Sequence, residues 1–592
     1  MIRRIVWSCV TLAVFLPSIA SAQTSANARP LTRLVAADVG LCVEVRQFAK
    51  TWPAVAGSEF FKRIERLSFY RKWKAGNEYR KLLQTRSEIE AVIGKPLIRL
   101  TDELFGDDVV VAVYVDDRGR SQGVLLTRTA GVSVLEAAIA AWDRAEHPTT
   151  IARGESGGRY FRRVVRREQG RDDTLYYAKL GRTLAVSDQE AMIRRVLDLN
   201  RLSRPAQGSN GSPGKSLFDS AVYQRASGSL PKKTVASIYF NPRPWDGLFS
   251  SGSSPSGAKS VLISLWRRCR SVMVGLRVDR GVVFDAVVDY DGSGVPEAWT
   301  RFVRQAAGSP AFFQKVPRRA LLAFGGRFSP SGLRELINRQ MSDSPRNRWD
   351  SLRQVSRGLL LGLDLVDDVL PGLGPNWGFY MVPRQQDIRS APGSRLPPVN
   401  GLLAIDLAAK KSASPGRPTL RAGLENGLNT GLNMLAALYN SQSSGPPAIV
   451  RTRRGRTGVV HWIEGIDGYQ PAYALTATHL IFAGSPKLVD EFAATDSRSA
   501  LTSSGNYQRL SQQYFTGAGQ VLLVRVDAIR DLVRQHAAFF VRRAAKSPSQ
   551  RVRNRFNNVR EILTLFDSAF IAAGVTNDRV RLVIGGVVQD DR

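Results

Sequence analysis

Hydrophobic positions along the chain form short runs of strand length that alternate irregularly with helical patterns. The runs at 109–115 and 521–526 end at polar or turn residues, and the segment 176–186 has the pattern of a hairpin. One amphipathic helix is clear, because apolar residues recur at helical spacing at Val132, Leu135, Ile139 and Trp142. Hairpins beside helices favour the α+β class, with an antiparallel or mixed sheet covered by helices, over a doubly wound parallel fold.

The same succession of patterns occurs twice. The matched stretches keep their order, and they are 41–45 with 321–325, 109–115 with 377–382, 123–126 with 401–404, 177–186 with 473–482, and Tyr223-Gln224-Arg225 with the identical Tyr507-Gln508-Arg509. Chance would not preserve such an order, and a repeated pattern marks a repeated structural unit. We therefore expect two similar tandem units, unit one at 30–300 and unit two at 310–592.

Each expected unit has a helix start after its matched hairpin. Ser187, followed three residues later by Glu190, predicts a capping box in unit one. Ser485, followed by Pro486, predicts a helix start in unit two, because proline is favoured in the first turn.

The N-terminus has the pattern of a secretory signal peptide. Arg3 and Arg4 precede an apolar run at 5–15, and Ala20-Ser21-Ala22 provides a small-residue cleavage site, so we expect a signal peptide at 1–22. The apolar run is shorter than the roughly 20 residues that span a bilayer as a helix. We expect an exported chain, periplasmic or secreted, with no transmembrane segment in the mature protein.

Charge is the most unusual feature of the composition. The formal net charge is +33, and an excess of this size attracts anionic partners over long range. For an exported chain these partners are acidic polysaccharide or an anionic lipid surface, whereas nucleic acid is not expected. The alternative is that the arginines serve solubility and hold no specific ligand.

Two sets of basic residues are the candidates for polyanion binding, because the arginine fork matches phosphate and carboxylate groups. The first lies near the C-terminus and comprises Arg542, Arg543, Lys546, Arg551, Arg553 and Arg555. The second lies on matched strands of the two expected units and comprises Arg162, Arg163, Arg166, Arg453 and Arg454. The alternatives are a solvated helix and loop for the first set, and basic edge strands that prevent aggregation for the second.

Two cysteines remain after the signal, Cys42 and Cys269, so the chain has no disulfide framework. A single bridge between them and two buried thiols are the alternatives. The thiols are favoured, because the corresponding stretches of unit two contain no cysteine.

No motif predicts catalysis, a metal or a cofactor. His147, His461, His479 and His536 are dispersed along the chain without the short spacing of metal ligands. The segment 154–158 fits the pattern G-x-S-x-G, but it precedes a strand rather than following one, and Gly214-Lys215-Ser216 lacks the glycine that a phosphate-binding loop requires. Both are therefore interpreted as loops.

The leading hypothesis is an exported, non-enzymatic protein whose basic surfaces bind acidic envelope polymer or anionic lipid. The first alternative is a hydrolase of the cell envelope that uses carboxylates, with candidates at Asp102, Glu103, Asp107 and Asp108. The second is a structural scaffold in an envelope assembly. The sequence leaves the ligand and the oligomeric state open.

Three segments carry a resemblance to a known family. They are Leu34-Val35-Ala36-Ala37-Asp38 before the strand 41–45, Leu104-Phe105-Gly106, and Leu180-Gly181-Arg182 before the strand 184–187. The chain resembles a family of exported bacterial proteins with a domain of unknown function, whose members begin on a segment like Leu-Pro-Ala-Asp. Val35 stands where proline is usual. The resemblance implies export, two tandem diverged copies here, and no catalytic residues.

Overall fold

A computed structural model describes residues 30–588, apart from 48–52, 94–106, 117, 147, 156–157, 167–171, 203–215, 248–262, 264–265, 279, 294–299, 301–303, 331, 336–342, 385–397, 409–417, 444, 456–457, 467–468, 537–560 and 577. The predicted signal at 1–22 lies outside the described residues. The chain divides into two compact units, a first unit of 1–291 with 587–592 and a second unit of 292–586.

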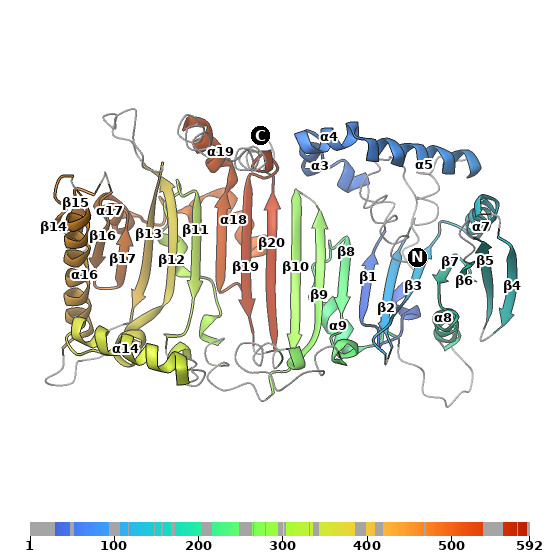
Figure 1. Cartoon of the computed structure of the whole chain (residues 1–592), viewed down its shortest axis with the longest axis horizontal. Coiled ribbons are helices and arrows are strands. Elements are labelled where there is room, and N and C mark those ends of the chain that lie inside the picture. Colours follow the sequence, from blue (N-terminus) through green and yellow to red (C-terminus); the bar gives the residue numbers. More distant parts are fainter. Residues whose placement is uncertain are drawn as a thin grey trace. The chain divides into compact units, whose positions relative to one another are not determined.

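The first unit is built on one antiparallel sheet (Figure 1). Among the described residues its order is β4-β5-β6-β7-β3-β2-β1-β8-β9-β10. The strands are β1 (Leu41–Val45), β2 (Val109–Val115), β3 (Ser121–Arg128), β4 (Thr150–Glu155), β5 (Arg159–Arg166), β6 (Asp172–Leu180), β7 (Thr183–Ser187), β8 (Ala236–Phe240), β9 (Cys269–Val278) and β10 (Gly281–Tyr290).

Helices lie on both faces of this sheet. They are η1 (Leu31–Leu34), α3 (Glu59–Glu65), α4 (Ser68–Ala75), α5 (Asn77–Ile93), α7 (Val132–Glu146), α8 (Glu190–Leu202), α9 (Ala221–Ser227) and η2 (Arg243–Trp245). Buried residues of η1, α8 and α9 form one core with Cys42, Val110 and Tyr239. Leu135 and Ile139 of α7 pack on the other face, against Tyr177 and Leu184.

Alternation of side chains explains the packing of the central strands. In β2, each second residue is buried, so that Val110, Ala112 and Tyr114 face the helix-covered core. β-branched residues fill this strand because they fit a pleated surface. The prediction that Val132 belongs to the buried face of the amphipathic helix is wrong. Its side chain lies at the start of α7 and is 49% exposed.

The predicted capping box is also wrong. The Ser187 hydroxyl accepts from the backbone N–H of Gln189 and donates to the carbonyl of Gly123, which joins the helix start to β3. The Glu190 carboxylate accepts from Tyr160 and Arg194 instead of returning to the backbone of Ser187. Tertiary contacts have therefore replaced the local cap.

The second unit is also built on one antiparallel sheet (Figure 1). Its order among the described residues is β14-β15-β16-β17-β13-β12-β11-β18-β19-β20. The strands are β11 (Leu322–Arg327), β12 (Leu373–Pro383), β13 (Val399–Leu407), β14 (Ile449–Gly455), β15 (Gly458–Glu464), β16 (Ala472–Leu475), β17 (His479–Ala483), β18 (Gln520–Arg525), β19 (Ser568–Val575) and β20 (Arg579–Val587).

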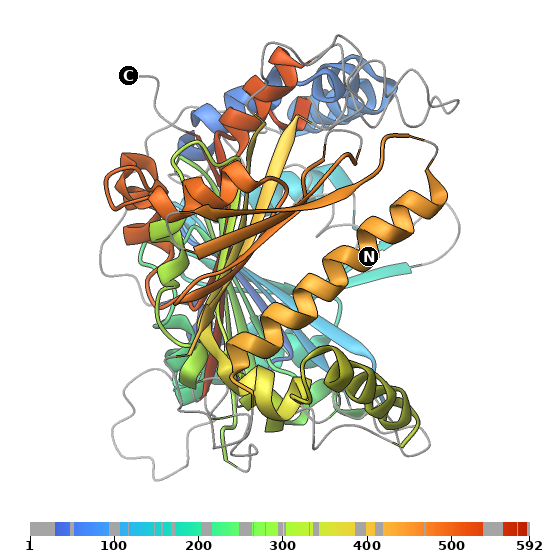
Figure 2. The same cartoon turned by 90° about the vertical axis from the view of Figure 1, so that its left-hand side faces the viewer.

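The helices of the second unit include α16, which runs diagonally over the strands with α14 beside it (Figure 2). They are η3 (Ala311–Lys315), α14 (Asp343–Leu359), η4 (Leu365–Val369), α15 (Leu370–Gly372), α16 (Leu420–Gln442), α17 (Pro486–Ala494), η5 (Leu501–Ser503), α18 (Gly505–Tyr514) and α19 (Val526–Gln535). The predicted helix start at Ser485 and Pro486 is confirmed. The α+β class is likewise confirmed.

No helix within the described ranges is long and apolar enough to cross a membrane.

Candidate functional site

The structure places the predicted basic residues in different environments. All six of the C-terminal set, Arg542, Arg543, Lys546, Arg551, Arg553 and Arg555, lie outside the described residues. Arg162 is exposed on β5, and Arg166 ends that strand opposite Asp172. Arg453 and Arg454 are exposed on β14.

Arg163 is a structural residue. Its side chain is 1% exposed, and its guanidinium donates to Asp143 at 2.9 Å and to the carbonyl of Trp142 at 3.1 Å. The guanidinium also lies 4.4 Å from the centre of the Trp142 ring. Because these contacts engage it inside the fold, we exclude Arg163 from the polyanion-binding surface.

β14 is the most basic described strand of the second unit. It pairs with β15 alone among the described strands, and its residues 451–454 are all exposed. Arg451 pairs with Glu464 at 3.0 Å and Arg453 pairs with Asp490, whereas Arg454 forms no ion pair with a described residue. The strand therefore presents arginines from both of its faces.

The carboxylates considered for hydrolysis are paired or outside the described residues. Asp107 lies 3.4 Å from Arg182, and Asp108 lies 3.0 Å from Arg128. Asp102 and Glu103 belong to the undescribed segment 94–106. Both described carboxylates are therefore engaged in ion pairs just before β2, which lies between β1 and β3 in the sheet.

The histidines make separate contacts. His461 stacks on Tyr473 with ring centres 4.8 Å apart, and burial lowers its pKa. His479 lies between Asp406 at 3.2 Å and the Thr478 hydroxyl at 2.7 Å. No group of three or more potential metal ligands occurs within the described part of the chain.

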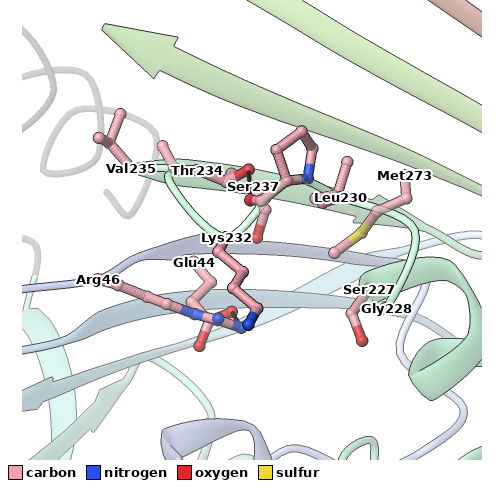
Figure 3. Close-up of a pocket in the computed structure, with 12 residues that line it drawn as sticks. Glu44, Arg46, Ser227, Gly228, Leu230, Lys232, Thr234, Val235, Ser237 and Met273 are labelled. Carbon is pink, nitrogen blue, oxygen red and sulfur yellow. Dashed lines mark hydrogen bonds and ion pairs between the residues drawn. The ribbon is translucent and has the colours of Figure 1, made fainter. Parts of the chain in front are cut away.

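A pocket in the first unit brings charged side chains together (Figure 3). It has a volume of about 280 Å³, and it lies between the ends of β1 and β8 and the turn that follows α9. Glu44 and Arg46 come from the end of β1, and Lys232 comes from the turn. Leu230, Pro231 and Met273 supply an apolar wall.

Glu44 is the buried charge of this pocket. Its side chain is 5% exposed, because residue 44 has the same orientation on β1 as the buried Cys42. One carboxylate oxygen, Oε2, accepts from Arg46 at 2.8 Å and from the Tyr223 hydroxyl at 3.4 Å. Thr32 in turn hydrogen-bonds to Tyr223, so the carboxylate is held by a polar network.

Arg46 and Lys232 bring positive charge to the pocket mouth. The Arg46 side chain is 57% exposed, and Lys232 is exposed and extends toward the Glu44–Arg46 pair in Figure 3. Burial acts to lower the pKa of Arg46, but the hydrogen bond and charge of Glu44 outweigh it and raise the pKa above its ordinary value. Two cations thus face one carboxylate.

Two buried groups close to Glu44, the Tyr223 hydroxyl and the Cys42 thiol, stay neutral. Burial, and next the charge of Glu44, raises the pKa of both Tyr223 and Cys42. Tyr223 therefore keeps its proton and donates to Glu44.

Gln47, two residues past Val45, has a left-handed backbone with φ of 48°, a conformation that non-glycine residues adopt rarely and that often accompanies function.

The sequence analysis did not single out this pocket. A signal was present, since Glu44 occupies the same face of an apolar strand as Cys42, where a charge is costly. Nothing local, however, indicates that Tyr223 and Lys232 meet it, because they follow some 180 residues later.

The chain was compared with known proteins. No protein-family model matches it, and no curated protein matches it in sequence. The solved structures described as "Structure of crystal form III of TP0453" and "Structure of crystal form IV of TP0453" are each 8% identical, with a TM-score of 0.21. They cover 48% and 45% of this chain and 91% and 81% of their own. A likeness this weak supports no conclusion, and the family resemblance stays a prediction.

Proposed function

We propose that this chain is an exported, non-enzymatic binding protein of two similar tandem units, whose ligands are anionic groups of envelope polymer or lipid. The single observation that carries the ligand class is the run 451–454 of β14, in which three arginines stand exposed on an edge strand. The net charge of +33 supports it, because a basic surface concentrates anions around the protein.

The strand orders support the tandem part of the proposal. Adding ten to each strand number of the first unit gives the order of the second, from β4 with β14 to β10 with β20. Helices follow the same scheme, since α7 and α16 each precede the edge hairpin, and α8 and α17 each follow β7 and β17. Two unrelated sheets of this size have no reason to agree in order.

Strand registers then align individual residues. Leu41 faces Val113 on β2, and Leu322 faces Met381 on β12, so that Leu41 corresponds to Leu322. The buried positions agree, with Cys42 matching Ala323. On this alignment the sequence-based match of 41–45 with 321–325 is wrong by one residue, a slip that would exchange the two faces of the strand.

Exposed apolar residues on the sheets are the reason to test lipid, as well as polymer, as the source of the anionic ligand. Ile238 on β8 and Phe284 on β10 of the first unit are 42% and 47% exposed, although both lie within strands of the sheet. Ile571 and Ile584 of the second unit are 40% and 43% exposed. Exposed apolar side chains on a basic protein suit a lipid surface better than a polysaccharide.

The test is retention of the full chain on an acidic polysaccharide resin and on anionic vesicles, over a series of salt concentrations. We expect retention on at least one of these, falling as salt rises, because surface charge is screened. The double change Arg453→Gln and Arg454→Gln should weaken retention by roughly thirtyfold, given about 1 kcal/mol per basic residue at an anionic surface.

A matched control removes two charges elsewhere, by Arg144→Gln and Arg201→Gln on exposed helix positions. If this control weakens retention equally, the effect belongs to net charge and not to β14. Retention that salt does not change, or none at all, would contradict the proposal. Size-exclusion chromatography of the same protein tests the scaffold alternative, which requires an assembly.

One arrangement favours the hydrolase alternative. Thr478, His479 and Asp406 form a hydroxyl–imidazole–carboxylate chain beside a cavity of about 250 Å³, and Asn376 donates to the second oxygen of Asp406 at 2.7 Å. The corresponding place in the first unit holds the ion pair of Asp108 and Arg128, which suggests a structural role. Ester hydrolysis that His479→Ala abolishes would revive this alternative.

A further inference from the structure

We infer that the pocket at Glu44, Arg46 and Lys232 is a small-ligand site, present once per chain, for an acid group that carries neighbouring hydroxyls. The inference rests on the proposed function and names the chemical group that this site takes. Both a sugar acid of a polysaccharide and a glycerol phosphate of a lipid headgroup offer this chemistry.

The second unit shows what the fold requires at this place. The alignment that matches Leu41 with Leu322 matches Glu44 with Gly325, Arg46 with Arg327 and Tyr223 with Tyr507. At Gly325 a Cβ atom would lie 2.6 Å from the ring of Phe313, so this ring fills the space that a side chain at 325 would need. Phe313 also packs on Tyr507, with ring centres 5.3 Å apart.

Phe313 itself matches Thr32, since each lies buried in the short helix before the first strand. The first unit therefore has threonine, glutamate and tyrosine where the second has phenylalanine, glycine and tyrosine. A fold that closes with an aromatic core has no structural need for a buried carboxylate, and burying a charge is costly. Glu44 is explained more simply by a ligand than by stability.

The side chains define the ligand's chemistry. Arg46 and Lys232 supply two positive charges at the mouth, and Lys232 forms no ion pair among the described residues, so an anionic group fits between them. Glu44 is an acceptor and suits hydroxyl donors, while Leu230, Pro231 and Met273 suit a C–H face. A volume of about 280 Å³ admits a single small unit, such as one sugar residue.

Calorimetric titration of the full chain with four probes tests the inference. D-Glucuronate and glycerol 1-phosphate each carry an acid group and hydroxyls, glucose lacks the acid, and acetate lacks the hydroxyls. We expect saturable binding of at least one of the first two with one site per chain, weaker binding of acetate, and no binding of glucose. Which of the first two binds tighter distinguishes a polysaccharide from a lipid source.

Variants assign the binding to the pocket. Lys232 is exposed, so the fold should tolerate Lys232→Ala, and this change should lower the affinity for the acid probe about tenfold. Arg46→Gln should lower that affinity at least as much. Glu44→Gln should lower the affinity for the acid that carries hydroxyls to the affinity for acetate. Arg327→Gln, at the matched position of the second unit, should leave binding unchanged.

A double change, Thr32→Phe with Glu44→Gly, copies the second unit into the first and should abolish binding while the chain stays folded. Two sites per chain, equal effects of Arg46→Gln and Arg327→Gln, or glucose binding as well as glucuronate would each overturn the inference. Retention on polymer or vesicles without any saturable probe binding would overturn it and leave the proposed function standing. Probe binding without retention would overturn only the proposed function.

Discussion

At the scale of single residues, the proposed correspondence of the two units matches positions that hold different side chains. His461 on β15 corresponds to Phe161 on β5, and each stacks on a tyrosine, Tyr473 in one unit and Tyr177 in the other, with ring centres 4.8 and 5.0 Å apart. The phenylalanine buries no polar atom, whereas His461 buries Nδ1 without a hydrogen-bond partner among the described residues. The comparison indicates that the second unit loses stability at His461.

We predict that His461→Phe stabilises the protein by about 1 kcal/mol, because it removes a buried, unsatisfied nitrogen. Burial lowers the pKa of His461 in the folded state below its ordinary value of 6.5. As the pH falls through that value, the unfolded chain gains a proton that the folded chain does not, so stability falls. Thermal unfolding at pH 7.5 and pH 5.5 should show a larger gain from His461→Phe at the lower pH.

Phe161→Tyr is a control that leaves the second unit untouched and should show no such pH dependence. A gain that does not grow between pH 7.5 and pH 5.5 would mean that His461 is protonated freely in the folded protein.

Residue chemistry also limited what the sequence could predict of the site. Charge counting identified arginines, and of those described Arg162, Arg453 and Arg454 are exposed. The same counting could not separate Arg163, because its burial depends on Asp143 and Trp142, some 20 residues away. Glu44 was not predicted as a site residue, because a single carboxylate in a strand does not indicate which cations of other elements lie close to it.

At the scale of elements, two glycines of α16 differ in what surrounds them. A Cβ atom at Gly423 would lie 2.5 Å from Cδ1 of Leu363 and 2.8 Å from the carbonyl oxygen of Leu360, whereas one at Gly431 would meet nothing within 4 Å. Gly423 therefore lets α16 approach the turn that follows α14. Gly431 has no such role, and glycine there only weakens the helix.

We predict that Gly423→Ala destabilises the second unit by about 1–3 kcal/mol, since a backbone oxygen must move to admit the methyl group. Gly431→Ala should instead stabilise it by up to about 1 kcal/mol through helix propensity. Thermal unfolding of the two variants beside the parent checks both signs. Equal stabilisation by the two changes would show that the approach at Gly423 does not exist.

Elements with strong local patterns were predicted well. The run 109–115 coincides with β2, and 521–526 differs from β18 by one residue, because valine-rich alternation is decided locally. The order of the strands was not predictable, since β1 pairs with both β2 and β8 and no local signal names a distant partner. The apolar face of α7 was misjudged at its first residue, where the helix emerges from the core.

At the scale of the whole molecule, Cys42 and Cys269 are free thiols, so the predicted alternative of a bridge between them is wrong. Cys42 faces Tyr239 on β8, and Tyr239 faces Met273 on β9, so Cys42 lies two strands away from Cys269. Two strand spacings are about 10 Å, beyond the reach of a disulfide. Cys42 is 2% exposed in the centre of the first unit's sheet.

We predict that Cys42 resists thiol reagents until the first unit opens. Burial raises its pKa, and both access and the reactive thiolate are therefore lacking in the folded state. In a chain with Cys9→Ser and Cys269→Ser, the labelling rate should rise with denaturant at the same midpoint as the loss of secondary structure. Fast labelling in buffer alone would show that β1 is not buried, and a chain with Cys42→Ser that keeps Cys269 provides the comparison.

The central position of the first strand has a consequence for synthesis. Leu41 on β1 faces Phe240, and Leu322 on β11 faces Val524, each partner arriving roughly 200 residues later. Neither sheet can close while the ribosome is still making the middle of its unit. The nascent chain of each unit thus stays open through most of its synthesis, and each sheet closes only when its last strands have emerged.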